Sequence, residues 1–137
     1  MRYLLDTNVC IELLRPGRGE PIRLRIDSLG SEDDVVLCSV VRYELVHGAM
    51  RSERREQNLE RVREFVAQFP SLAFDDAAAD HAADIRAALD AAGLPVGAAD
   101  VLIASIARSA GAVLVSANVA EFSRVPELRV ENWQDRA

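Results

Sequence analysis

The chain has 137 residues and a net charge of −6 at pH 7, and it contains 16 arginines but no lysine. A chain of this length can bury one hydrophobic core, so we predict a single domain over residues 1–137. The acidic balance argues against binding nucleic acid through a broad basic surface. No apolar stretch approaches the roughly 20 residues of a membrane helix, and the acidic start does not resemble a signal peptide. We therefore expect a cytoplasmic protein without a membrane segment.

Short, continuous apolar runs predict buried strands, and the amphipathic runs between them predict helices. A strand at residues 3–5 is followed by a short helix that ends before Pro16. A second helix begins at Pro21, a favoured residue in a first helical turn, and Gly30 ends it. The next strand covers residues 35–38, and Ser39 is expected to cap the helix that follows it.

The second half of the chain continues the same alternation. A long charged helix runs from Arg51 until Pro70 stops it, and a weak strand follows at residues 71–74. An alanine-rich helix then ends at Gly93, and a largely apolar, and therefore central, helix begins near Asp100. The last elements are a strand at 112–115, an extended piece at 128–130 and Trp133 as a packing anchor. The alternation predicts an α/β fold with a mostly parallel sheet covered on both faces.

The two cysteines and two histidines form no zinc pattern. Cys10 and Cys38 lie in apolar surroundings, where a thiol packs as a small hydrophobic group, and a cytosolic disulfide is not expected. His81 is expected to be a surface or packing residue. For His47, a position on a helix surface without a ligand is the commoner outcome.

The first strand ends in a carboxylate, Asp6, followed directly by Thr7 and Asn8. Thr7 or Asn8 is placed to cap the next helix. Burying a carboxylate is costly unless something compensates it, so the strand predicts either a capping role for Asp6 or a bound cation.

Further polar residues follow the other strands. Glu44 lies on the helix after the second strand, Asp100 opens the central helix, and Ser116 and Asn118 follow the fourth strand. Ligands of open α/β sheets bind outside the carboxyl ends of the strands, so these side chains should meet Asp6 there. Carboxylates at one place repel one another unless a cation lies between them, and an all-oxygen set suits Mg²⁺ or Mn²⁺.

Such a site supports metal-assisted hydrolysis of phosphodiester bonds. We expect Asp6 and Asp100 to be direct ligands and Glu44 to act through water or to orient the nucleophile. Asn118 is expected to organise the ligands from outside. The alternatives are a salt bridge from Glu44 to Arg42 or Arg86 and a simple turn role for Asn118. A row of acids, Asp76, Asp80 and Asp84, is interpreted as the solvated face of a helix.

Four blocks resemble the signature blocks of PIN-domain ribonucleases: LDTN at 5–8, YELVHGA at 43–49, GAADVLIA at 97–104 and LVSAN at 114–118. The segment at 122–133 is similar to the end of VapC toxins within that family. The resemblance covers essentially the whole chain, and four blocks in order are far more specific than one. It implies a PIN-like three-layer α/β/α sandwich with a four- to five-stranded sheet.

The resemblance also implies a function. It implies a Mg²⁺- or Mn²⁺-dependent endoribonuclease that is the toxin of a type II toxin–antitoxin pair, forms a homodimer, acts on tRNA or rRNA and is inhibited by a VapB antitoxin. The site residues that it implies are Asp6, Glu44, Asp100 and Asn118, supported by Thr7, Asn8 and Ser116. Many relatives have Asp where this chain has Asn118, which leaves the number of metal ions open.

Other functions fit the sequence less well. The phosphorylation chemistry of a response-regulator receiver domain resembles a pattern that needs a lysine, and this chain has none. A haloacid-dehalogenase-type phosphatase needs an aspartate at the position of Asn8. A module whose acidic pocket only binds a protein partner remains an alternative. For an acidic ribonuclease, local arginines must help to bring RNA to the site; the candidates are Arg15, Arg18, Arg42 and Arg51. An antitoxin could place a basic side chain in the same pocket.

Overall fold

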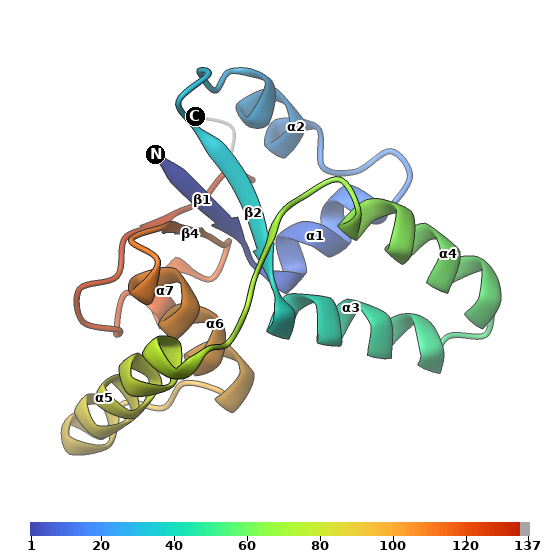
Figure 1. Ribbon diagram of the computed structural model, residues 1–137. Helices are drawn as coiled ribbons and strands as arrows, with labels where there is room; N and C mark the ends of the chain where they lie inside the picture. Colours follow the sequence, from blue (N-terminus) through green and yellow to red (C-terminus); the bar gives the residue numbers. More distant parts are fainter. Residues whose placement is uncertain (135–137) are drawn as a thin grey trace.

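The computed structural model describes residues 1–134 and contains a five-stranded, entirely parallel sheet in the order β3-β2-β1-β4-β5. The central strand β1 comes first in the chain, and its neighbours follow on both sides (Figure 1). The predicted α/β class with a four- to five-stranded, mostly parallel sheet is confirmed. The strands are β1 (Arg2–Leu5), β2 (Asp34–Cys38), β3 (Ser71–Leu72), β4 (Val113–Val115) and β5 (Val130–Glu131).

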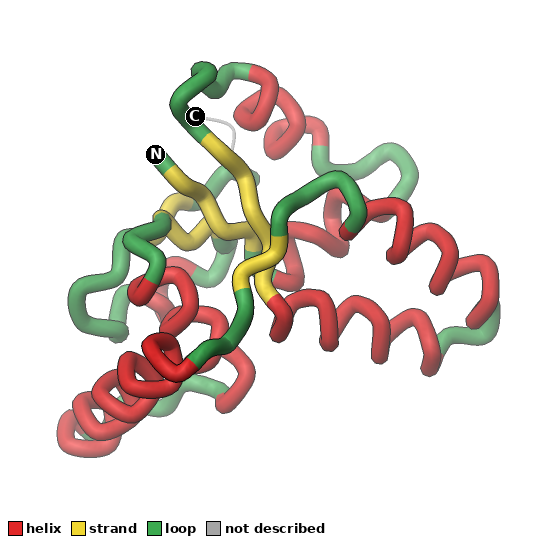
Figure 2. Tube along the Cα trace, in the orientation of Figure 1, coloured by secondary structure: helices red, strands yellow, loops and turns green. Residues whose placement is uncertain are grey.

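Helices flank this sheet, with α1, α2 and α4 on the right of the strands in Figure 1 and α5, α6 and α7 on the left. Helix α3 pairs with α4, and α5 pairs with α6, as two helical hairpins that extend outward from the sheet (Figure 2). The helices are α1 (Thr7–Leu14), α2 (Glu20–Asp27), α3 (Ser39–Arg51), α4 (Arg55–Val66), α5 (Asp76–Ala92), α6 (Ala98–Ser109) and α7 (Val119–Phe122). No helix within residues 1–134 is long and apolar enough to cross a membrane.

The strand register brings the carboxyl ends of β1 and β4 together. Leu5 lies opposite Val115 in the parallel pair, and the Asp6 amide donates to the Val115 carbonyl at 3.0 Å. The residues that follow the two strands, Asp6 and Ser116, are therefore neighbours across the sheet edge. This register creates the position at which a ligand of an open α/β sheet binds.

One hydrophobic cluster contains the buried apolar side chains of the sheet and of the helices on both sides. Leu4 and Leu5 of β1 are fully buried, as is expected for a central parallel strand covered on both faces. Six residues of α6 are buried, which confirms the prediction that this helix is central. Trp133 is also buried, with its ring centroid 5.0 Å from that of Tyr3, so it packs the segment after β5 against the first strand. Cys10 and Cys38 are buried free thiols, as predicted.

The caps expected from Thr7 or Asn8 and from Ser39 differ from the structure, whereas the alternative capping role of Asp6 is observed. Asp6 itself caps α1, because its backbone is extended and its Oδ1 accepts from the Val9 amide at 2.9 Å. Thr7 is already inside the helix, so neither it nor Asn8 is the cap. Ser39 is likewise the first residue of α3 and does not cap it; its Oγ accepts from the Phe74 amide at 3.1 Å. That bond ties the segment after β3 to the beginning of α3.

Two elements have different bounds from those predicted, and a third was not predicted. Strand β3 stops after Leu72, and Phe74, expected in the strand, is 39% exposed. Helix α4 begins at Arg55 instead of Arg51, because residues 52–54 form the turn of the α3–α4 hairpin. The short helix α7 was not predicted, since four residues are too few to show a helical period.

Two glycines provide a matched test of backbone effects on stability. An added Cβ would meet nothing within 4 Å at either Gly48, inside α3, or Gly93, which ends α5 with φ of 66°. We expect Gly48→Ala to stabilise the protein by about 0.5–1 kcal/mol, because alanine loses less backbone entropy in a helix. Gly93→Ala should destabilise it by about 1–2 kcal/mol, because the left-handed conformation strains an L-residue. Urea unfolding measures the free energy of unfolding of each variant. Changes in the same direction in the two variants would contradict the backbone conformations of Gly48 and Gly93.

Candidate functional site

Asp6 lies at the base of the site, with only 5% of its surface exposed. Burial raises the pKa of its carboxyl group, and the nearby Glu44 adds to this effect. Hydrogen bonds from the Ser116 hydroxyl and the Val9 amide act in the opposite direction, because they favour the charged form. The capping alternative and the ligand prediction are compatible: one carboxylate oxygen caps α1, and the group still faces the other acids of the site.

Glu44 reaches the same place from α3. The Thr7 hydroxyl donates to Glu44 Oε1 at 2.5 Å, so the first turn of α1 fixes the side chain of α3. The salt bridge considered as an alternative is not observed within residues 1–134. Arg86 instead donates to the Val96 carbonyl at 3.2 Å. Thr7 is therefore in direct contact with Glu44, one of the expected site residues.

Asp100 lies in the first turn of α6, where the helix dipole favours an anion. Its pKa is nevertheless raised to about 6. Partial burial is the largest cause, followed by the negative charges of Glu121, Glu44 and Asp6 in that order. The structure thus brings Asp6, Glu44 and Asp100 within electrostatic reach of one another, as predicted from their places at the strand ends.

Asn118 joins the site through a residue that the sequence analysis missed, Glu121. Asn118 Nδ2 donates to Glu121 Oε2 at 2.6 Å, and the Gly97 amide donates to Glu121 Oε1 at 3.3 Å. These two hydrogen bonds hold the Glu121 carboxylate of α7 against the beginning of α6, where its charge acts on Asp100. The Asn118 amide donates to the Ser116 hydroxyl oxygen at 2.9 Å, so Ser116 connects Asn118 to Asp6. The three-residue spacing from Asn118 to Glu121 was the available sequence signal.

The remaining predicted residues lie outside this network. Asn8 is exposed on α1. Arg18 and Arg15 are paired with Glu12, at 2.9 Å and 4.0 Å, whereas Arg42 and Arg51 are exposed on α3. The row Asp76, Asp80 and Asp84 is exposed, as predicted, and Asp84 pairs with Arg108 at 2.7 Å. Arg108 Nε also donates to His81 Nδ1 at 2.8 Å, so His81 is a packing residue.

The charge of the site is not balanced by the part of the chain that the structure describes. None of the four acids Asp6, Glu44, Asp100 and Glu121 forms an ion pair there with a basic side chain. Within residues 1–134, no three acidic, histidine or cysteine side chains lie close enough together to form a metal cage. Mg²⁺ does not need one, because it keeps several waters and binds through one or two carboxylates. The oxygen-only donors and the uncompensated charge fit such a hydrated cation.

A groove leads away from this site. It has a volume of about 380 Å³ and runs between α1, α3 and α4. Glu44 lies on its wall, and the other walls are mostly apolar, with Leu14, Leu45 and Val62 among them. Arg61 and Asn58 add polar groups from α4. The acidic site is thus continuous, through Glu44, with a largely apolar groove.

The fold and the site define an α/β protein with an acidic pocket at the carboxyl end of a parallel sheet, which is the architecture of PIN domains. The sequence profile of the PIN domain family matches residues 3–128. The chain is 38% identical over 133 residues to the tRNA(fMet)-specific endonuclease VapC of Shigella flexneri, covering 97% of this chain and 98% of the relative. It is 32% identical over 133 residues to the ribonuclease VapC2 of Rickettsia felis, with the same coverage.

Solved structures agree with the sequence relatives. The crystal structure of VapBC2 from Rickettsia felis bound to a promoter DNA fragment matches with a TM-score of 0.91 and 31% identity, covering 97% of this chain and 99% of that one. DNA-bound VapBC from Salmonella typhimurium matches with a TM-score of 0.89 and 38% identity, covering 97% and 98%. The chain belongs to the PIN domain family and, within it, to the VapC ribonuclease toxins.

Proposed function

We propose that this VapC ribonuclease hydrolyses RNA phosphodiester bonds with the help of Mg²⁺ or Mn²⁺, held directly by Asp6 and Asp100 and through water by Glu44. The observation that supports this proposal is that the charges of Glu121, Glu44 and Asp6 all raise the pKa of Asp100, although none of these four acids has a basic partner in residues 1–134. A divalent ion bound there would neutralise charge on the phosphate oxygens and lower the pKa of an attacking water.

The residues of the chain have separate roles in this proposal. Asp6 is held in one orientation by the Val9 amide and Ser116, and its remaining oxygen lone pairs would be available to hold a cation. Glu44 is fixed by Thr7 and orients the attacking water or accepts its proton. Asn118 acts as a positioning residue, because it holds Glu121 beside Asp100. Fixed orientation of the ligands reduces the entropy lost when substrate binds.

The relatives suggest the substrate and the partner. The Shigella flexneri relative is named for tRNA(fMet), and the Rickettsia felis and Salmonella typhimurium structures are VapBC assemblies. We infer that this chain acts in the cytoplasm as a homodimeric single-domain toxin on a tRNA, and that a VapB-type antitoxin inhibits it. In the inhibited complex the antitoxin occupies the groove between α1, α3 and α4 and places a basic side chain among the acids near Glu44.

The test is RNA cleavage by the purified protein. Initiator tRNA should be cut at one or a few positions in Mg²⁺ or Mn²⁺, and EDTA should abolish cleavage. Adding the protein encoded beside this gene should stop cleavage if that protein is its antitoxin. Antitoxin binding should weaken when Asp6 and Asp100 are both changed to Ala, because the inserted basic group loses its charge partners. Cleavage that continues in EDTA, or no cleavage of any RNA, would reject the metal-dependent mechanism.

A further inference from the structure

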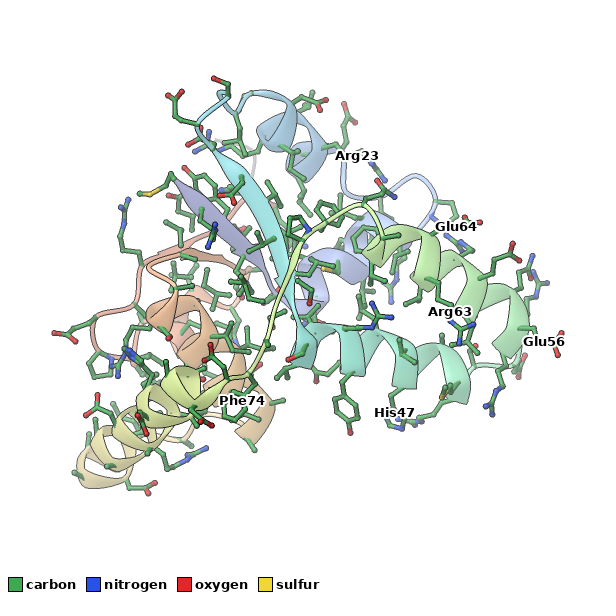
Figure 3. All side chains as sticks on the ribbon, viewed as in Figure 1. Arg23, His47, Glu56, Arg63, Glu64 and Phe74 are labelled. Atoms are coloured by element: carbon green, nitrogen blue, oxygen red, sulfur yellow. The ribbon has the colours of Figure 1, made fainter. Side chains whose placement is uncertain are left out.

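One face of α3 beside the acidic site carries an aromatic pair that the proposed reaction does not use. Tyr43 is 64% exposed, an unusual exposure for so large a ring. Its ring is stacked on that of His47, one helical turn further on, with centroids 5.9 Å apart and planes inclined by only 5°. His47 points away from the body of the molecule in Figure 3. The chain thus holds two parallel rings in solvent.

The pair lies next to the candidate ligands. Tyr43 and Glu44 are adjacent on one turn of α3, with Cα atoms about 3.8 Å apart, and their side chains leave the helix on neighbouring faces. Glu44 turns inward to Thr7, whereas Tyr43 turns outward to solvent. A molecule that crosses this turn therefore touches the aromatic face and the acidic site together.

Other side chains make the same surface suitable for RNA. Arg51 lies one turn beyond His47 on the same helix face, is exposed, and forms no ion pair within the described part of the chain. Phe74, 39% exposed, lies near the other end of this face, because its amide is bonded to Ser39 at the beginning of α3. Planar rings bordered by an unpaired guanidinium match unstacked bases and their phosphates.

We propose that the stripe Tyr43–His47–Arg51 on α3 binds unpaired nucleotides beside the cleavage site: a base stacks on the outer face of Tyr43, His47 supports that ring from behind, and Arg51 contacts a phosphate. This inference rests on the proposed function and narrows its substrate to RNA whose bases are unstacked at the cut. It also explains how a chain of net charge −6 retains a polyanion, because stacking does not depend on net charge.

The test is binding of a short single-stranded RNA with one 2-aminopurine, in Mg²⁺ and in an Asp100→Asn background that prevents cleavage. Tyr43→Ala should weaken binding by roughly 5- to 150-fold and remove the quenching of 2-aminopurine, whereas Tyr43→Phe should keep both. Arg51→Gln should lower the slope of affinity against salt by about 0.7, the value for one phosphate contact on a single strand. Leu24→Ala, which removes an exposed apolar side chain on α2, is the matched control. It should leave the RNA affinity, the quenching of 2-aminopurine and the salt dependence unchanged.

The outcomes separate this inference from the proposed function. If an RNA base stacks on Tyr43 but the protein with its native Asp100 cleaves no RNA, RNA binding by the stripe is supported and the nuclease mechanism is rejected. If the unmodified protein cleaves RNA but Tyr43→Ala and Tyr43→Phe bind the RNA with equal affinity, RNA binding by the stripe is rejected and the nuclease mechanism is not. Failure of the RNA to bind the Asp100→Asn protein would also reject RNA binding by the stripe. A change of oligomeric state in Tyr43→Ala with unchanged RNA affinity would assign this face to self-association and overturn the inference.

Discussion

Replacing Asp100 or Asp6 with Asn is expected to lower the rate of RNA cleavage by at least about 100-fold. Each change keeps the size of the side chain but removes a negative charge that would bind the divalent ion. Loss of a residue that only supports a metal ligand costs about 10- to 100-fold, so loss of a ligand should cost at least that much. Single-turnover cleavage of initiator tRNA in saturating Mg²⁺ measures the effect.

Asp80→Asn is the matched control. Asp80 is an exposed acid on α5, so its replacement changes the net charge by the same amount away from the site. We expect its cleavage rate to stay within about twofold of the unmodified protein. Equal cleavage by the Asp6 and Asp100 variants would show that hydrolysis does not depend on these carboxylates and would reject the proposed mechanism. Equal losses in all three variants would point to net charge instead.

The sequence predicted the site where a residue's position follows from strand order. Asp6 follows a continuous apolar run, and Asp100 begins an apolar helix, so both could be placed at the carboxyl edge of a parallel sheet without coordinates. Glu44 could be placed because it lies in the second turn of the helix after β2. In each case a buried element fixes the direction in which the chain leaves the sheet.

Glu121 could not be identified in the same way. It lies on α7, a helix of four residues, and so short a segment shows no hydrophobic period. Its place beside Asp100 depends on two tertiary hydrogen bonds, from Asn118 and from the Gly97 amide. The prediction that Thr7 or Asn8 caps α1 was wrong for a related reason. Whether Asp6 or Thr7 caps the helix depends on a single residue of register at the end of β1, and propensity favours both types at that position.

The raised pKa of Asp100 predicts how the stability of the metal-free protein depends on pH. Its pKa is about 6 in the folded chain against an ordinary value of 3.8, so between these values the folded state binds more protons than the unfolded state. The free energy of unfolding should therefore fall as pH rises from about 4 to 6 and stay low above that range. Asp6 shifts in the same direction, whereas the lowered pKa of Asp33 acts below 3.8, outside this interval.

Variants and Mg²⁺ should each remove this pH dependence. Urea unfolding in EDTA should show a smaller fall in stability between pH 4 and 6 for Asp100→Asn. For Glu121→Gln the fall should begin at the same pH but end at a lower pH, because Glu121 is the largest single charge that raises the pKa of Asp100 in the folded chain. Asp80→Asn should behave as the unmodified protein does. At pH 7.5, Mg²⁺ at 100 times its dissociation constant should restore about 2.7 kcal/mol, and at pH 4.5 it should restore much less, because protonated Asp100 cannot hold it. Equal stabilisation by Mg²⁺ at both pH values would mean that the ion binds elsewhere on the chain.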